Sequence, residues 1–186
     1  MIESKVAVRY AKSLLGLAQE HGALDAVNED MLLVNHTINN SHDLSLLLKN
    51  PTVKTDKKVA IFTELFSGKV NKLSLSFLTL ITQKKREAYL QAIAYQFNKQ
   101  FKHVKGIETA VITTASGLDD NLRKQVIELV KKSSNKEQVE LVENVDKNLI
   151  GGFILRVGDR QVDSSILKSL RKANKELQAN VNIRLN

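Results

Sequence analysis

Cysteine and tryptophan are absent from this 186-residue sequence, which also has a single proline and only eight glycines. A chain without cysteine can form no disulfide, no thiolate metal site and no thiol nucleophile. No stretch has the composition of a flexible or proline-rich linker. No apolar run approaches the roughly 20 residues of a membrane-spanning helix, and the N-terminus lacks the separate apolar core of a signal peptide. We therefore expect a soluble globular protein in a bacterial-type cytoplasm.

Basic residues outnumber acidic ones, and the formal net charge is +8. Residues 1–105 carry 15 Lys and Arg against 9 Asp and Glu, a net +6, whereas residues 106–186 carry 13 against 11, a net +2. A basic surface is compatible with nucleic acid, an anionic membrane or an acidic protein partner. The densest basic cluster, Lys84-Lys85-Arg86, also suits the end of a helix, where cations interact favourably with the helix dipole.

Apolar residues in the first 105 positions recur with the period of an α-helix. The opening helix, which Gly22 would end, has one face made of Ala7, Ala11, Leu14 and Ala18. Further helices are predicted over residues 23–39, 42–50, 54–66, 71–84 and 86–106, with Ser41 as a cap and Asn50-Pro51 as a stop. Leu90, Ile93, Phe97 and Phe101 form the apolar stripe of the last of them. Six helices with short connections predict a helical bundle domain over residues 1–105.

From Gly106 the period changes to that of strands, which predicts a small α+β domain over residues 106–186. "GIETAVITTAS" predicts a strand, "LDDNLRKQVIELVKK" a helix, and "EQVELVENV" a half-buried antiparallel strand. "GGFILRV" predicts the next strand and "DSSILKSLRKANKEL" the last helix. The positions expected to face inward are Leu122, Val126, Leu129, Val130, Val139, Leu141, Val145, Ile166, Leu170, Ala173 and Leu177. The fold class is therefore mainly α, with a six-helix bundle followed by a small α+β domain.

Residues that could carry chemistry are not arranged for it. The four histidines, His21, His36, His42 and His103, are scattered, and no metalloprotease, nucleophile-elbow or kinase pattern is present. The Gly68-Lys69 pair lacks the upstream glycine and the following Ser or Thr of a phosphate-binding loop. Acidic pairs such as Asp119-Asp120 suit helix starts. We expect no catalytic residue, no metal site and no cofactor.

Nucleic-acid binding is the alternative that the basic excess leaves open. The sequence has no zinc-finger, RRM, KH or homeodomain pattern. Aromatic residues are only 5% of the chain, and Tyr89, Tyr95, Phe97 and Phe101 follow helical spacing, which favours core packing over base stacking. The pattern therefore favours a binding or connecting protein without nucleic acid as a partner, and keeps a basic nucleic-acid-binding adaptor as the runner-up.

The stretch "LIGGFILRVGDRQVDSS", residues 149–165, looks like a phosphate-binding loop but has the wrong order for one. A phosphate loop runs from a strand through glycines into a helix N-terminus, whereas here the glycines precede the apolar run. Gly151-Gly152 predict a bulge or a close backbone approach. Gly158-Asp159 predict a turn, and Asp163 or Ser164 is expected to cap the last helix.

Several segments resemble one family. "VRYAKSLLGLAQEHG" resembles the opening helix of the delta subunit of bacterial F-type ATP synthases, which is similar to the mitochondrial oligomycin-sensitivity-conferring protein. "FLTLITQKKREAYLQAI" resembles the family's fifth helix and the turn after it, with Arg86 at the usual arginine. "QKK" departs from the family, in which an Asn and a Gly often precede that arginine. Residues 149–170 resemble the C-terminal signature, so the resemblance covers essentially the whole chain.

The resemblance implies a non-catalytic stator (peripheral-stalk) subunit. In this family the N-terminal bundle binds the N-terminal segments of alpha subunits on top of the catalytic head. The C-terminal domain binds the end of the b-subunit stalk, so that rotation is coupled to proton transport and ATP synthesis. The implied location is the cytoplasmic face of the bacterial cell membrane, with membrane contact only through the complex.

Two sets of contact residues follow from this resemblance. For the alpha-subunit segment we expect a groove between the first and fifth helices, with Tyr10, Ala11, Leu14, Phe77, Leu80 and Ile81. The alternative is that most of these six belong to the bundle core. For the b stalk the candidates are Arg156, Arg160, Lys168, Arg171 and Lys172, which would face acidic residues. The alternative for these five is a solvated basic helix face.

Overall fold

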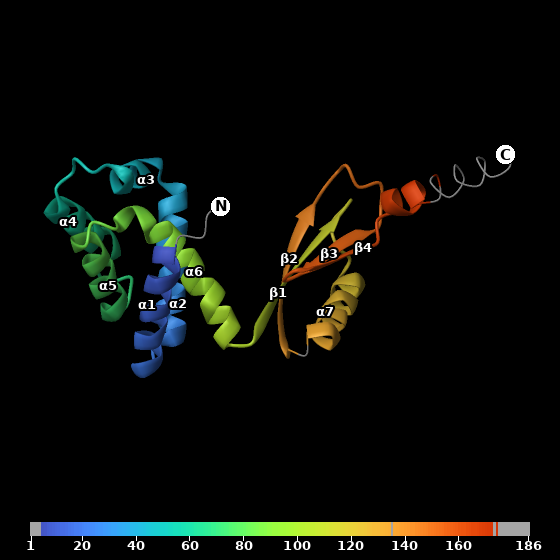
Figure 1. Cartoon of the computed structure of the whole chain (residues 1–186), viewed down its shortest axis with the longest axis horizontal. Coiled ribbons are helices and arrows are strands. Elements are labelled where there is room, and N and C mark those ends of the chain that lie inside the picture. Colours follow the sequence, from blue (N-terminus) through green and yellow to red (C-terminus); the bar gives the residue numbers. More distant parts are fainter. Residues whose placement is uncertain (1–4, 135, 173, 175–186) are drawn as a thin grey trace. The chain divides into compact units, whose positions relative to one another are not determined.

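The computed structural model describes residues 5–134, 136–172 and 174. The chain divides into two compact units, Met1–Lys105 and Gly106–Asn186. The first is helical and the second combines a helix with a four-stranded sheet (Figure 1). The fold is therefore mainly α with a C-terminal α+β part, which confirms the predicted fold class.

The first unit contains six α-helices and one 3-10 turn within its described residues. They are α1 (Lys5–Glu20), α2 (Leu24–Asn40), α3 (His42–Lys49), α4 (Thr55–Phe66), α5 (Lys72–Gln83), η1 (Glu87–Tyr89) and α6 (Leu90–Val104). The predicted caps and stops lie where expected. Gly22 follows α1 in the left-handed region, with φ 62°, and the Ser41 hydroxyl accepts a hydrogen bond from the backbone N–H of Leu44, 3.2 Å away.

The sixth helix begins four residues later than predicted, because the chain first forms the turn η1. Lys85 adopts a left-handed conformation, with φ 56°. The N–H groups of Lys85 and Arg86 then bond back to the carbonyls of Thr82 and Ile81, at 2.9 and 3.0 Å. This hydrogen-bond pair closes α5 and redirects the chain.

The core of the first unit forms where α6 packs against both α1 and α2 (Figure 1). The predicted stripe of α6 is confirmed, since Leu90, Ile93, Phe97 and Phe101 are all buried. The alanines of α1 are buried too, and small side chains let neighbouring helices come close. Tyr89 and Tyr95 were expected in the core, and this was wrong. Both are exposed, because they lie on sides of the chain that no other described element covers.

The second unit is a β1–α7–β2 crossover followed by a hairpin. Its elements are β1 (Ile107–Thr114), α7 (Asp120–Ser134), β2 (Gln138–Val145), β3 (Phe153–Val157) and β4 (Arg160–Asp163), in the sheet order β2-β1-β3-β4. β2 pairs parallel with β1, whereas β3 and β4 pair antiparallel. The antiparallel prediction for β2 was wrong. The helix between the two strands carries the chain back to the end of the sheet where β1 begins, so β2 runs parallel to β1.

The core of this second unit lies between one face of the sheet and α7. Ala110, Ile112 and Leu155 of the sheet pack with Val126 and Val130 of the helix. Leu122, Val139 and Leu141 are partly buried against them. Two inward predictions were wrong: Leu129 is 52% exposed and Val145 is 58% exposed. Leu129 lies at the edge of the buried stripe of α7, and Val145 is the last residue of an edge strand.

The 149–165 stretch forms a joint between the sheet and the last helical residues, 166–172. The predicted close approach is confirmed at Gly152, which has φ 78° and where a Cβ atom would lie 2.3 Å from the carbonyl oxygen of Ser164. The helix cap is neither Asp163 nor Ser164. The hydroxyl of Ser165 accepts from the N–H of Lys168 at 3.2 Å, while Asp163 accepts from the N–H of Ser165 at 3.0 Å.

The inward orientation predicted for the last helix was wrong for two residues, since Ile166 and Leu170 are about half exposed. No other element within the described ranges covers these side chains. The other two predicted positions of that helix, Ala173 and Leu177, lie outside the described residues.

Candidate functional site

A groove of about 570 Å³ lies between α1 and α5 in the first unit. α6 holds α1, and α4 and α2 hold α5, so the two helices flank an opening rather than packing closely on each other. The described residues that line the groove are Leu14, Leu17, His21, Ala23, Asn71, Lys72, Leu73, Ser76, Phe77 and Leu80. The groove is therefore mainly apolar, with Asn71, Lys72 and His21 at one end and Ser76 as a further polar residue along α5.

The six residues expected at this groove separate into three groups. Leu14, Phe77 and Leu80 line it, and Leu80 is 46% exposed. Ala11 and Ile81 are fully buried and are not among the lining residues. Tyr10 is half-buried and touches the lining through Phe77, with ring centroids 6.5 Å apart and an edge-to-face angle of 68°.

Tyr10 also joins α1 to the turn that follows α5. A guanidinium nitrogen of Arg86, Nη1, donates to the phenol oxygen of Tyr10 at 3.1 Å. The same guanidinium lies 5.4 Å from the centroid of the Tyr10 ring, within the range of a cation–π contact. Arg86 and Tyr10 are 76 residues apart in sequence, so no local pattern could have predicted this pair.

Helical spacing could have found more of the lining than the six expected residues. Leu17 and His21 follow Leu14 at i+3 and i+7, which places all three on one side of α1. Leu73 precedes Phe77 by four residues and Leu80 by seven, which extends the lining side of α5 in the same way. Lys72 precedes Ser76 by four residues and fits the same spacing, whereas Asn71 precedes α5 and carries no such signal.

The start of α5 is anchored by a buried carboxylate from α2. Asp30 accepts hydrogen bonds from the backbone N–H of Asn71 at 2.9 Å and from the hydroxyl of Ser74 at 2.5 Å. The side chain of Asn71 caps the same turn by accepting from the N–H of Leu73 at 3.0 Å. Because Asn71 and Lys72 line the groove, the Asp30 contacts set the position of one of its walls.

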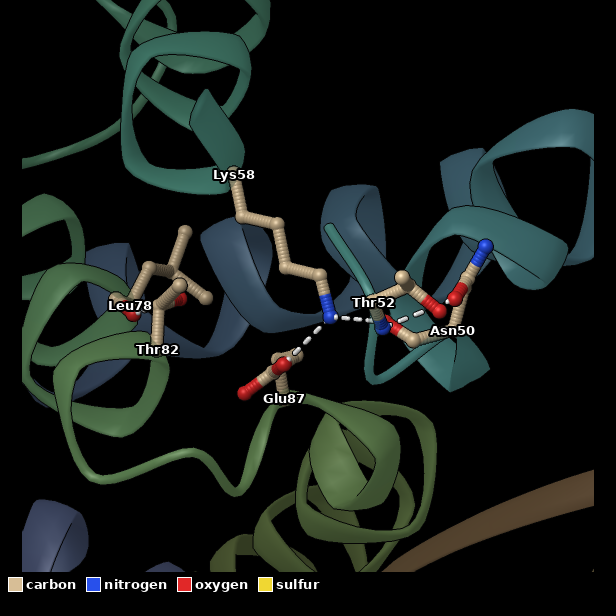
Figure 2. Close-up of polar contacts among 6 residues, drawn as sticks. All are labelled: Asn50, Thr52, Lys58, Leu78, Thr82 and Glu87. Carbon is tan, nitrogen blue, oxygen red and sulfur yellow. Dashed lines mark hydrogen bonds and ion pairs between the residues drawn. The ribbon is translucent and has the colours of Figure 1, made fainter. Parts of the chain in front are cut away.

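A buried ion pair fixes the opposite end of the α4–α5 pair (Figure 2). The ammonium of Lys58 lies 2.5 Å from a carboxylate oxygen of Glu87 and donates to the carbonyl of Asn50 at 2.7 Å. The side chains of Lys58 and Glu87 are only 2% and 10% exposed. No local sequence pattern indicates this pair, since its members are 29 residues apart. It ties α4 to η1 and to the loop after α3.

The basic residues expected to bind the b stalk do not form one flat patch. The register pairs Arg156 with Gln161 and Val157 with Arg160, so Arg156 and Arg160 point to opposite faces of the sheet. Lys168, Arg171 and Lys172 are exposed on the last helical residues. Arg156 and Arg160 are also exposed.

The residues that the structure describes contain no group of three or more His, Asp or Glu side chains placed to hold a metal ion. None of their helices combines the length and the apolar character needed to cross a membrane.

An open apolar groove between two helices is a recurring binding site for the apolar face of an amphipathic helix. The comparisons with known proteins are specific. Residues 6–177 match the family model for the ATP synthase delta (OSCP) subunit, and the chain belongs to this family. It is thus a member of a family of ATP synthase peripheral-stalk subunits, which confirms the resemblance.

Relatives match over nearly their whole length. ATP synthase subunit delta of Cytophaga hutchinsonii is 40% identical, with 92% of this chain and 93% of the relative covered. That of Flavobacterium psychrophilum is 36% identical, covering 95% and 99%. A chain in the mitochondrial ATP synthase hexamer of Toxoplasma gondii has the same fold, with a TM-score of 0.74, 20% identity and coverage of 94% and 98%.

Proposed function

We propose that this chain is a non-catalytic stator subunit that links the alpha/beta head of an F-type ATP synthase to the b-subunit stalk. By holding the head against the turning rotor, it couples proton transport to ATP synthesis. It acts at the cytoplasmic face of a bacterial cell membrane and reaches the membrane only through the complex. The observation that carries this proposal is the apolar groove between α1 and α5. The comparisons give no support to the nucleic-acid alternative.

The groove suits the apolar face of an amphipathic helix, for which the N-terminal segment of an alpha subunit is our candidate. Leu17 and Leu80 are 45% and 46% exposed, and a helix lying between them would remove their apolar surface from water. Such burial contributes about 25 cal/mol per Å². A stator joint must resist torque, and helix-in-groove packing spreads the load over many contacts.

The six candidate residues take different roles in this proposal. Leu80 and Phe77 touch the alpha segment, because they line the groove and keep exposed surface, whereas the fully buried Leu14 supports its floor. Ala11 and Ile81 lie beneath it as bundle core and keep α1 and α5 in place. Tyr10, held by Phe77 and Arg86, braces α1 against α5 next to the lining.

For the second unit we propose contact with the C-terminal end of the b stalk. Lys168, Arg171 and Lys172 are exposed on consecutive turns of the last described helical residues, and acidic side chains of the stalk would pair with them. Arg156 and Arg160 lie on opposite sheet faces, so one stalk helix would engage only one of them at a time. Raising the salt concentration should weaken this contact, since exposed charges are screened.

The decisive experiment is a pull-down of the tagged full chain from membrane extracts of its own organism. Alpha, beta and b subunits should co-purify. Leu80→Asp places a charge in the groove at an exposed position and should abolish recovery of the alpha subunit while circular dichroism stays unchanged. Leu46→Asp is the matched control, because Leu46 of α3 is exposed and does not line the groove.

Full recovery of alpha by the Leu80→Asp variant would overturn the groove assignment. Leu14→Asp is unsuitable for this test. Leu14 is fully buried, and an uncompensated carboxylate at that position should unfold the bundle rather than report on binding.

A further inference from the structure

The α1/α5 groove is chemically different at its two ends. α1 and α5 run antiparallel, because His21 just after α1 and Lys72 at the start of α5 line the same groove, while Tyr10, one turn into α1, contacts Phe77 and Arg86. The polar lining residues Asn71, Lys72 and His21 gather where α1 ends and α5 begins. The rest of the described lining consists of leucines, Phe77, Ala23 and one uncharged polar residue, Ser76.

Among the described polar residues at this end of the groove, Lys72 is the one with a formal positive charge. Its side chain is exposed, and it forms no ion pair or hydrogen bond with another described residue. No carboxylate is found among the described lining residues. Asp30, the acidic residue at the start of α5, is buried and already accepts from Asn71 and Ser74, so it does not neutralise Lys72 at the surface.

We propose that the helix bound in this groove carries an acidic side chain at the Lys72 end, and that this charge sets the direction in which the helix lies. This inference rests on the proposed function and adds to it the polarity of the partner. The imidazole of His21 offers a further hydrogen-bonding group at the same end of the groove.

We expect Lys72 to contribute modestly to the affinity for the bound helix but to discriminate between its two directions. Exposed ion pairs are weak by themselves, but a charge at the rim of an interface steers association and disfavours the wrong arrangement. The apolar lining supplies most of the affinity and carries no charge. A single charge at one end is therefore enough to distinguish a helix from the same helix reversed.

The test measures binding of the full chain to a fluorescent peptide with the N-terminal segment of the alpha subunit from the same organism. Lys72→Glu should weaken binding about five- to tenfold at low salt, and the loss should shrink at high salt. Lys69→Glu is the matched control, since it makes the same change in net charge at an exposed residue outside the groove lining. It should bind like the unchanged protein.

A charge exchange then locates the partner residue. Peptides in which each acidic residue is replaced in turn by Lys are measured against Lys72→Glu, and one of them should recover most of the lost affinity. If Lys72→Glu binds no worse than Lys69→Glu, or no exchanged peptide recovers affinity, the polarity inference is wrong. If Leu80→Asp loses binding in the same assay, the groove remains supported as the binding site even where the polarity inference fails. If Leu80→Asp still binds the peptide, the proposed function is wrong.

Discussion

The hydroxyl of Ser74 at the start of α5 donates a hydrogen bond to the carboxylate of Asp30 in the middle of α2, at 2.5 Å. Asp30 accepts from the N–H of Asn71 as well, so one buried carboxylate satisfies two donors of an adjacent helix N-terminus. Such N-termini otherwise leave their first N–H groups without partners. Asp30 and Ser74 are 44 residues apart in the sequence. Their contact joins α2 to α5 and fixes the position of one wall of the groove.

Replacing Asp30 by Ala should lower the free energy of unfolding by about 1–3 kcal/mol, because the buried Ser74 hydroxyl and the part-buried Asn71 N–H lose their acceptor. Urea denaturation measures this change. Asp25→Ala on the same helix is the control, since Asp25 is exposed and pairs only with Lys105 at 2.8 Å. That variant should lose less than about 1 kcal/mol. Equal losses in the two variants would refute the anchoring role.

Breaking the Lys58–Glu87 pair from one side should destabilise the first unit strongly. Glu87→Leu alone leaves a buried ammonium whose remaining partner is the Asn50 carbonyl, and the expected loss is about 3–5 kcal/mol. Lys58→Met combined with Glu87→Leu removes both charges and should recover much of that loss. Thermal unfolding of the single and double variants compares them. A double variant no more stable than Glu87→Leu would contradict the buried-charge explanation.

The turn after α5 holds Lys85 in a conformation that glycine adopts more easily. With φ at 56°, a side chain at this position adds roughly 1 kcal/mol of strain. Lys85→Gly should therefore raise the unfolding free energy by up to about that amount. Lys84→Gly is the matched control, because Lys84 has an ordinary φ of −78° and glycine there should be neutral or destabilising. Chemical denaturation that ranks Lys84→Gly above Lys85→Gly would contradict this reasoning.

Asp163 links the stability of the second unit to pH. Hydrogen bonds from Ser165 lower the pKa of the Asp163 carboxyl, and the nearby Lys168 and Arg171 lower it further. A carboxyl with a depressed folded-state pKa stabilises the fold above its unfolded value, about 3.9. That stabilisation is lost as the pH falls below about 4 through the folded-state pKa.

Ser165→Ala should raise the pKa of Asp163, which a side-chain ¹³C titration measures directly. Ser164→Ala is the control, since Ser164 is exposed and its side chain is not among the groups that lower this pKa. An unchanged Asp163 midpoint in Ser165→Ala would show that the Ser165 hydroxyl does not stabilise the carboxylate, since the variant keeps the backbone N–H.

Short-range signals predicted much of the local structure. Gly22, Ser41 and Asn50-Pro51 mark helix ends in the sequence and in the structure, because caps and stops act within a few residues. The α6 stripe was also predictable, since one face of a 3.6-residue period must be buried. The direction of β2 was predicted wrongly, because alternation reports only which side chains face the core. The helix predicted between the two strands was the signal for a parallel pair.

The sequence by itself determined the helices of the first unit, the change of period at Gly106 and the resemblance that the comparisons confirm. These depend on residue order and spacing, which a linear pattern contains. Only the tertiary structure decided which apolar residues of α1 and α5 are core and which line a groove, since burial depends on whether another helix covers that side. It alone brought Lys58 to Glu87, Arg86 to Tyr10 and Asp30 to Ser74, because such contacts exist only after the helices have packed.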